Sequence, residues 1–384
     1  MPLNVRSSIR SFICPMHFTA WTRALRFCNM TNERTSVASL PTLDELRVRI
    51  GVSPSNVVTR YAWRGIEWDD ADGLHALADE RGGLRVSAGP EMPCRFFRGQ
   101  PQEHAPCLSK LGRLNTKDAP SVAHMLKELC RSVAFEHVMS DHPLVRLLES
   151  EKIAGHSFFV DKLALAQHYE LTTDMLDLTT NFDVASFFAT CAWDGRGYQP
   201  VPASAKAGVM YLVIAPLLAL DLAPHAALER LRIVGWQPLP RPERQRAWGL
   251  RLKLGDDFAS MPSVQCFRFQ HCNRISERIW NLFEGGRLLF PPEGAAFLAD
   301  RAKTLSQFTR RQIDEAWDRL QDWLGRRFDE GARALTENSA EIVETHIPVL
   351  SWVGLDVERD ESKLRVQVQS VMEKVGWRLA RTTK

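Results

Sequence analysis

The chain has 384 residues, and at roughly 150 residues per domain this length suggests one large domain with flanking elements, or two domains. Hydrophobic residues make up 45% of the sequence and charged residues 25%, and the net charge is only +3 because 49 basic residues nearly balance 46 acidic ones. Charge therefore does not indicate a nucleic-acid partner, and no apolar run approaches the roughly 20 residues of a membrane span. We expect a cytoplasmic protein with no membrane partner.

Residues 1–40 are expected to be either a disordered arm or the product of a mis-assigned start. The first 29 residues contain four arginines and no acid, which superficially resembles an organellar transit peptide. From Met30, however, the sequence looks like an ordinary protein start. We favour the arm or the mis-assigned start over the transit peptide.

Residues 41–93 read as a lead-in of short helices and strands. The stretch "LPTLDELRVRIGV" predicts a helix that begins after Thr42 as its cap, and "VVTRYAWRGIEW" alternates aromatic and charged side chains like a strand. The next stretch, "DDADGLHALADERGG", predicts another short helix that ends at its glycines.

In the stretch "CRFFRGQP", which runs from Cys94 to Pro101, Phe96 and Phe97 predict a short buried strand. Gly99 and Pro101 are expected to end this strand, so Arg98 should lie where the strand gives way to a loop. A fixed charge at a strand end is suited to holding a ligand anion. The alternative is a surface arginine that caps a sheet edge.

Strand and helix signals alternate along the rest of the chain. Residues 120–150 carry apolar side chains at helical spacing, "AGVMYLVIAPL" from Ala207 reads as a buried strand, and "RRQIDEAWDRLQDWLGRR" predicts a long amphipathic helix. We therefore predict an α+β domain over residues 94–305 and a mainly helical C-terminal extension over 306–384.

The eight cysteines form no Cys-x-x-Cys pair, so they indicate reduced thiols. Cys266, His271 and Cys272 are the one cluster with metal-ligand chemistry, but a second paired element at zinc spacing is missing. No metal site is predicted.

In "TTDMLDLTTNFDVASFFATCAW", an extended segment that ends at Thr179 leads into a helix. Thr180 and Asp183 stand at the spacing of a capping box, with the aspartate as a shorter substitute for glutamate. Free amides at such a junction can hold a phosphate. The simpler interpretation is that Thr180 only caps the helix.

Five blocks resemble, in order, the successive motifs of the FRG domain, a mainly bacterial module named for its Phe-Arg-Gly start. They span about residues 94–305 and read "FFRGQ", "APCLSKLGR", "LAQHYELTTDMLDLTTNFDVASFFA", "RPERQRAWGL" and "LLFPPEGAAFLAD". The chain departs from the usual family pattern at three places in the third block. It has Tyr169-Glu170 where the family usually has His-Gly, Asp174 for an arginine and Leu178 for a tryptophan. It also has "QRAWGL", from Gln245, where the family usually has Gln-x-Gly-x-Phe.

A more distant resemblance, to ADP-ribosyltransferases of the arginine, serine, glutamate type, implies an NAD-using transferase fold and a site. That pattern has an early arginine, then Ser-Thr-Ser before a helix, then a Gln/Glu-x-Glu strand. The resemblance implies that the cofactor-binding residues are Arg98, Gly99, Gln100, Thr179 and Thr180. The catalytic candidates are Glu243, Gln245, His168 and Asp177. Gln245 cannot ionise, and Glu243 precedes it where the transferase pattern has an acid two residues later.

Two functions follow as hypotheses. One is an NAD-using ADP-ribosyltransferase-like enzyme that modifies an unknown macromolecular acceptor in bacterial stress or phage and toxin conflict. The other is a non-catalytic module on the same fold that binds a nucleotide or a partner. For His168 the common alternative is a structural hydrogen-bonding residue. We expect Arg98, His168, Asp177, Thr179 and Gln245 to line one pocket.

Overall fold

The computed structural model describes most of the chain between Leu40 and Trp352 and a few later positions. The described residues are 40–52, 60–63, 66–69, 74–78, 83–88, 95–114, 118–153, 155–215, 217–218, 230–235, 239–352, 365–366, 369 and 375–376. Residues 41–384 form one compact unit, and every statement below concerns the described part of it. The expectations for residues 1–39 lie outside the described residues.

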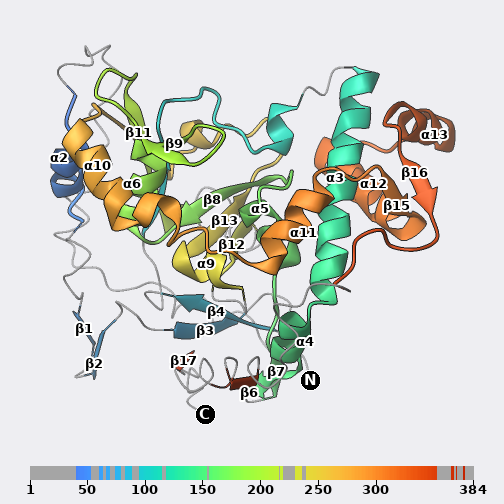
Figure 1. Ribbon diagram of the computed structural model, residues 1–384, viewed down its shortest axis with the longest axis horizontal. Coiled ribbons are helices and arrows are strands. Elements are labelled where there is room, and N and C mark those ends of the chain that lie inside the picture. Colours follow the sequence, from blue (N-terminus) through green and yellow to red (C-terminus); the bar gives the residue numbers. More distant parts are fainter. Residues whose placement is uncertain are drawn as a thin grey trace. The chain divides into compact units, whose positions relative to one another are not determined.

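Helices and strands alternate along this unit (Figure 1). The helices are α2 (Leu43–Arg49), η4 (Leu111–Arg113), α3 (Ala119–Ser140), α4 (Pro143–Ser150), α5 (Lys162–His168), α6 (Phe182–Thr190), α9 (Pro240–Arg244), η5 (Phe258–Ser260), α10 (Asn273–Leu282), η6 (Glu284–Gly286), α11 (Gly294–Ala302), α12 (Arg310–Leu324) and α13 (Glu330–Ser339). The strands are β1 (Arg60–Trp63), β2 (Ile66–Asp69), β3 (Leu74–Ala78), β4 (Leu84–Ala88), β5 (Arg95–Gln100), β6 (Lys152–Ile153), β7 (His156–Ser157), β8 (Met175–Thr179), β9 (Cys191–Trp193), β10 (Tyr198–Pro200), β11 (Gly208–Ile214), β12 (Leu231–Ile233), β13 (Ala247–Arg251), β14 (Val264–Phe269), β15 (Gln307–Thr309), β16 (Val343–Thr345) and β17 (Val375–Gly376).

The centre of the unit is a six-stranded antiparallel sheet with the spatial order β12-β13-β8-β5-β11-β14. The predicted strand from Ala207 is β11, which is buried along nearly its whole length. Its six registered pairs with β5 make a regular ladder, whereas β5 and β8 share only the pair Phe97–Thr179. The sheet therefore opens between β5 and β8, two strands that lie in its middle.

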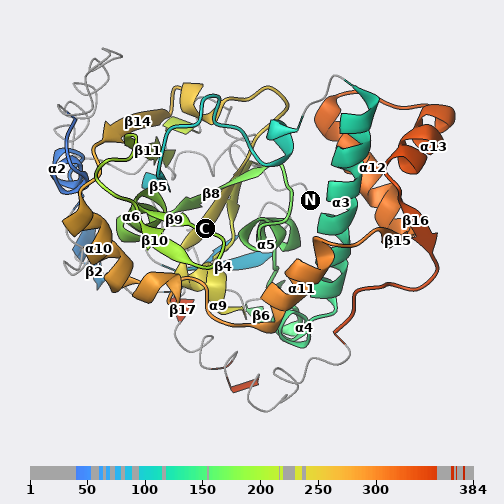
Figure 2. The same ribbon diagram turned by 45° about the horizontal axis from the view of Figure 1, so that its top comes forward.

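Helices cover one face of the sheet and carry much of its core. Helix α6 packs against β5 and β11, and α10 packs against α6, as Figure 2 shows. Apolar side chains of α2, α6, α10 and β5 form one buried cluster. A second cluster, with Phe96, Tyr211, Trp248 and Phe258, lies against the same strands. This is the α+β class that the alternating signals predict.

The C-terminal helices pack against the long helix α3 (Figure 1). The predicted amphipathic helix is α12, and its apolar face buries Ile313, Trp317 and Leu320 in one cluster with α3. Buried Glu136 of α3 pairs with Arg319 of α12. The extension predicted from residue 306 is thus joined by both apolar and ionic contacts to the part of the chain that carries the sheet.

The lead-in agrees with the sequence in part. Helix α2 begins after Thr42, whose hydroxyl accepts from the amide of Glu45 in a capping box. Where the sequence predicts one strand from its alternating aromatic and charged residues, the structure has two antiparallel strands, β1 and β2. The helix expected over residues 69–83 is wrong, because residues 74–78 form β3, which pairs with β4 and β17. The backbone hydrogen bonds from β3 to its two neighbouring strands outweigh the helix propensity of its alanine and leucine residues. None of the helices described has the length and apolar character needed to cross a membrane.

Candidate functional site

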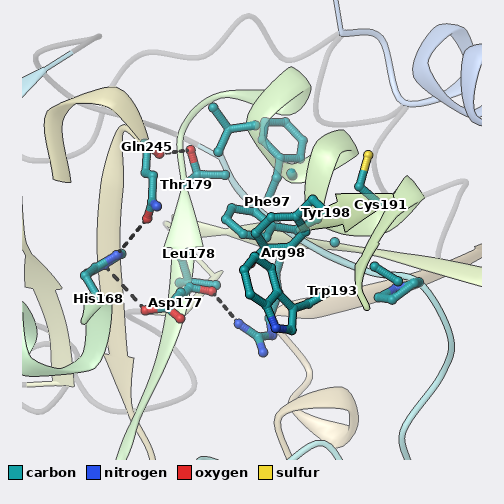
Figure 3. A pocket seen from close by; sticks show the side chains of 16 residues that line it. Phe97, Arg98, His168, Asp177, Leu178, Thr179, Cys191, Trp193, Tyr198 and Gln245 are labelled. Atoms are coloured by element: carbon teal, nitrogen blue, oxygen red, sulfur yellow. Dashed lines mark hydrogen bonds and ion pairs between the residues drawn. The ribbon is translucent and has the colours of Figure 1, made fainter. Parts of the chain in front are cut away.

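A cavity of about 310 Å³ lies where the central sheet opens between β5 and β8 (Figure 3). Strands β5 and β8, helix α6 and the β9–β10 hairpin supply most of its walls. The lining residues are Phe97, Arg98, Gly99, Pro101, His168, Asp177, Leu178, Thr179, Val184, Ala185, Phe188, Cys191, Ala192, Trp193, Tyr198 and Gln245. The convergence of Arg98, His168, Asp177, Thr179 and Gln245 that the sequence predicts is therefore present. Their chemical roles stay predictions.

Arg98 lies inside β5, not at its end as expected, because the strand continues through Gly99 to Gln100. Its Nη1 donates to the backbone oxygen of Asp177 at 2.9 Å, so the guanidinium bridges the two diverging strands. Its buried Nε has no partner, and Arg98 has no ion pair with any described acid. Nearby, the pKa of Arg113 is lowered by burial and then by the charge of Arg98. The cavity thus has an uncompensated positive charge at one wall.

Gly99 has a structural role that the sequence does not reveal. A Cβ at this position would lie 1.9 Å from the backbone oxygen of Ala185 and 2.8 Å from Cβ of Ala189, both on α6. The glycine therefore lets α6 rest directly on β5, and it does not end the strand as expected. The neighbouring Phe97 packs edge-on against Phe182 at the start of α6, with ring centroids 5.4 Å apart.

Asp177 presents the carboxylate of the cavity and is held from behind by α5. Nε2 of Gln167 donates to Oδ2 of Asp177 at 3.1 Å, and Nε2 of His168 lies 3.5 Å from Oδ1. The Asp177 side chain is 42% exposed, whereas that of His168 is 3% exposed. Asp177 is therefore the member of this group that a ligand can reach.

Gln245 fixes the protonation pattern of His168. Its Nε2 donates to the backbone oxygen of Leu289 at 3.1 Å, which turns its Oε1 toward Nδ1 of His168 at 3.0 Å. Nδ1 must then carry a proton, while Nε2 faces the carboxylate of Asp177. At 3.5 Å from Oδ1 of Asp177, Nε2 makes no hydrogen bond, so the contact with Gln245 is what orients the ring beside the carboxylate.

The junction between β8 and α6 differs from the expected capping box. The N-cap is Asn181, not Thr180, because Oδ1 of Asn181 accepts from the amides of Asp183 and Val184 at 2.8 and 3.2 Å. Asparagine binds these amides as well as threonine does, and the helix begins one residue later. The Thr179 hydroxyl donates to the backbone oxygen of Gln245 and accepts from the amide of Asn181. It therefore joins the β8–α6 junction to the backbone of Gln245, the residue at which α9 ends.

Three of the predicted site residues do not line the cavity. Glu243 lies on α9, Thr180 follows β8, and the Gln100 side chain points to Cys107, with Nε2 at 4.0 Å from its Sγ. Among the predicted acids, Asp177 alone faces the cavity. Gln245 lines it but is neutral, so the sequence pattern alone would place the acid wrongly.

An aromatic wall faces Arg98 and was not predicted. It consists of Phe188, Trp193 and Tyr198, and the last two are directly paired in the β9–β10 hairpin. The sequence does carry a signal for it: in "CAWDGRGYQP" two short apolar runs flank a Gly-rich turn, which is typical of a hairpin. Burial raises the pKa of Cys191 to about 12 and also raises that of Tyr198. Neither group ionises near neutral pH, so Asp177 remains the anionic group of the lining.

The departures from the usual family pattern have local explanations. Glu170 adopts φ +65°, the left-handed conformation that the family glycine would adopt without strain. Asp174 pairs with Arg251 at 2.7 Å. Leu178 is registered opposite Trp248 of β13, so the large aromatic side chain missing from β8 is supplied by its neighbour. Leu178 lines the cavity, whereas Glu170 and Asp174 do not, so the changes leave the charged lining residues Arg98 and Asp177 in place.

The comparisons with known proteins agree with the motif order. The family model of the FRG domain matches residues 94–195, which include β5, α3, α5, β8, α6 and β9. Neither a curated protein nor a solved structure matches the chain. The match covers the first three motif blocks, and β11, β13 and β14 complete the sheet beyond it. Residues 94–195 are thus an FRG domain.

Proposed function

We propose that the cavity binds NAD and that the domain transfers ADP-ribose from it to a macromolecular acceptor. The observation that carries the proposal is one cavity in which an uncompensated guanidinium, an accessible carboxylate and an aromatic wall face one another. A dinucleotide presents the complementary groups, namely phosphates, a cationic ring and planar bases.

Arg98 would hold a phosphate or ribose oxygen of NAD. One Nη1 contact to Asp177 leaves most of the five guanidinium donors unused, and bidentate binding of phosphate needs two of them. Because this arginine lies in a central strand of the sheet, its position is fixed by packing and not by a loop.

Asp177 would act on the reacting carbon. In the transfer, the bond between C1′ of the ribose and the nicotinamide nitrogen breaks, and its electron pair leaves with nicotinamide. The acceptor supplies the pair for the new bond at C1′ and releases its proton to solvent. Positive charge develops on the ribose meanwhile, and a carboxylate held in place stabilises it. Gln167 donates a hydrogen bond to the Asp177 carboxylate and His168 lies beside it, so both residues hold the carboxylate in place.

The second candidate is a module that binds the nucleotide without cleaving it. The neutral side chain of Gln245 favours it, because this residue stands where the transferase pattern has its Gln/Glu-x-Glu strand and is fully engaged with His168 and Leu289. Binding needs Arg98 and the aromatic wall, whereas transfer needs Asp177 as well.

Calorimetric titration with NAD, combined with an assay for free nicotinamide, separates the two candidates. Asp177→Asn preserves shape and removes the charge, so we expect NAD affinity within about threefold of the wild type and nicotinamide release at least about 100-fold slower. Asp141→Asn, at an exposed position outside the cavity, is the matched control and should behave as the wild type. Binding without release in the wild type would select the non-catalytic module. No binding at all would refute both candidates.

A further inference from the structure

Trp193 is a large aromatic residue that lines the cavity and yet is 61% exposed. Trp317 and Trp248, by contrast, are 0% and 6% exposed in apolar clusters. An indole left open to water loses the stabilisation that burial would give it, which is about 25 cal/mol per Å² of apolar surface. The exposure is therefore a feature that the fold itself does not require.

The backbone below Trp193 is held firmly. The turn that follows it has Gly195 at φ +98°, and Oδ1 of Asp194 accepts from the amides of Arg196 and Gly197 at 2.8 and 2.9 Å. The carbonyl of Tyr198, the residue paired with Trp193, accepts from Nε1 of Trp280 at 2.6 Å. The hairpin is thus fixed both at its turn and on its outer strand.

The ring of Trp193 is supported on one side. It meets Tyr198 edge-on with ring centroids 5.3 Å apart, and Tyr198 stacks on Phe290 at 5.1 Å and 16°. Arg241 lies over the Phe290 ring at 5.1 Å, which continues the contacts away from the cavity. Figure 3 shows the indole on the same side of the site as Arg98. A supported ring with an open face at a cavity mouth is suited to stacking a second planar ring.

We propose that Trp193 is the stacking platform for the heteroaromatic base of the nucleotide whose phosphate binds Arg98. The inference rests on the proposed function and adds a ligand class to it: a planar base joined to ribose phosphate. A base is favoured over an aliphatic group because the cavity also contains a cation and an anion, and a nucleotide joins an apolar ring face to charged groups within one small molecule.

The test measures binding of three ligands by calorimetry: ADP-ribose, nicotinamide mononucleotide and ribose 5-phosphate. For Trp193→Ala we expect about a 5- to 150-fold loss of affinity for a ligand whose base stacks there, and about a twofold change or less for ribose 5-phosphate. Trp193→Phe keeps a ring and should stay within about fivefold of the wild type. Loss with ADP-ribose assigns adenine, and loss with the mononucleotide assigns nicotinamide.

Phe297→Ala is the matched control, because Phe297 is an aromatic residue 53% exposed on α11 and outside the cavity lining. Its ligand affinities should equal those of the wild type. Thermal melts of both alanine variants should match the wild type, since each truncated ring is mostly in water.

Several outcomes would overturn the inference. If the wild type binds ADP-ribose or the mononucleotide and Trp193→Ala binds them equally well, the platform is refuted while the proposed function stands. If the wild type binds none of the three ligands, the proposed function is refuted and the platform with it. If Trp193→Ala keeps binding and nicotinamide release but loses transfer of labelled ADP-ribose to protein in a cell extract, Trp193 contacts the acceptor instead.

Discussion

Replacement of the motif glycine, Gly99→Ala, tests whether that residue serves packing or ligand binding. The added Cβ would lie 1.9 Å from the backbone oxygen of Ala185, and ordinary van der Waals contact begins at 3.4 Å. Helix α6 would therefore have to withdraw from β5 by about 1.5 Å. The obstacle is main chain within a helix, so no side-chain rotation can relieve it.

The expected cost follows from this displacement. Overpacking by a single methyl group usually costs about 1–3 kcal/mol, and a clash with backbone in the middle of a core lies at the upper end. Reduced freedom of the unfolded chain returns about 0.4–1 kcal/mol. We expect Gly99→Ala to lower the free energy of unfolding by at least about 2 kcal/mol and Tm by about 5–10 °C.

Urea unfolding followed by circular dichroism and a thermal melt measure this change, and Gly331→Ala provides the matched control. Gly331 lies in the first turn of α13, where a Cβ would meet nothing closer than Oδ1 of Asp329 at 3.4 Å. The same chemical change should there raise stability by up to about 1 kcal/mol. A Gly99→Ala protein as stable as the wild type would refute the packing explanation. If such a protein lost NAD binding, the glycine would instead be a ligand contact.

Three further predictions concern residues whose partners the structure identifies. Gln245→Glu should lower the free energy of unfolding by about 1–3 kcal/mol, because a carboxylate oxygen would replace the amide that donates to the Leu289 carbonyl. The same change should not speed nicotinamide release. A thermal melt and a release assay measure the two effects. Glu170→Gly should raise the free energy of unfolding by up to about 1 kcal/mol, because glycine adopts the left-handed conformation at this position without strain, and Glu170→Ala should not. The hydrogen bond from His137 lowers the pKa of Glu315 from 4.5 to about 2. The stabilisation of the folded state by ionised Glu315 is therefore fully present above pH 4.5 and is lost as the pH falls toward 2. The difference in Tm between wild type and Glu315→Gln should therefore shrink on acidification, and a difference that grew would contradict this.

Local patterns in the sequence predict the elements that depend on local chemistry. The helix after Thr42, the strand up to Thr179 and the long helix with Trp317 on its buried face follow from capping, alternation and helical spacing. The helix expected over 69–83 fails because β3 is specified by pairing with β4 and β17, whose sequences lie elsewhere in the chain. Propensity cannot report such a distant partner.

The candidate site also depends on contacts between distant parts of the chain, which the sequence reports only in part. Motif order brings Arg98, Asp177 and Gln245 together correctly, since family blocks keep the residues that the fold makes neighbours. The acid is not determined in this way, because Glu243 and Asp177 are both candidates in the sequence, and Glu243 on α9 lies outside the cavity lining whereas Asp177 is part of it. Trp193 could have been found from its hairpin, but its exposure at a cavity could not.

The opening between β5 and β8 connects the fold to the chemistry that we propose. In a continuous ladder the backbone oxygen of Asp177 would accept from an amide of the adjacent strand, but here the antiparallel pairing covers only Phe97 and Thr179, so β5 after Phe97 and β8 before Thr179 are unpaired with each other. Nη1 of Arg98 takes the place of that amide, and a neutral carbonyl satisfies a hydrogen bond without cancelling the charge. A carboxylate in the same position would have closed an ion pair and left nothing to attract an anion. The arginine of the motif can therefore hold the sheet together at its opening and still present a positive charge to the cavity, which explains why a structural contact and a binding role can belong to one residue.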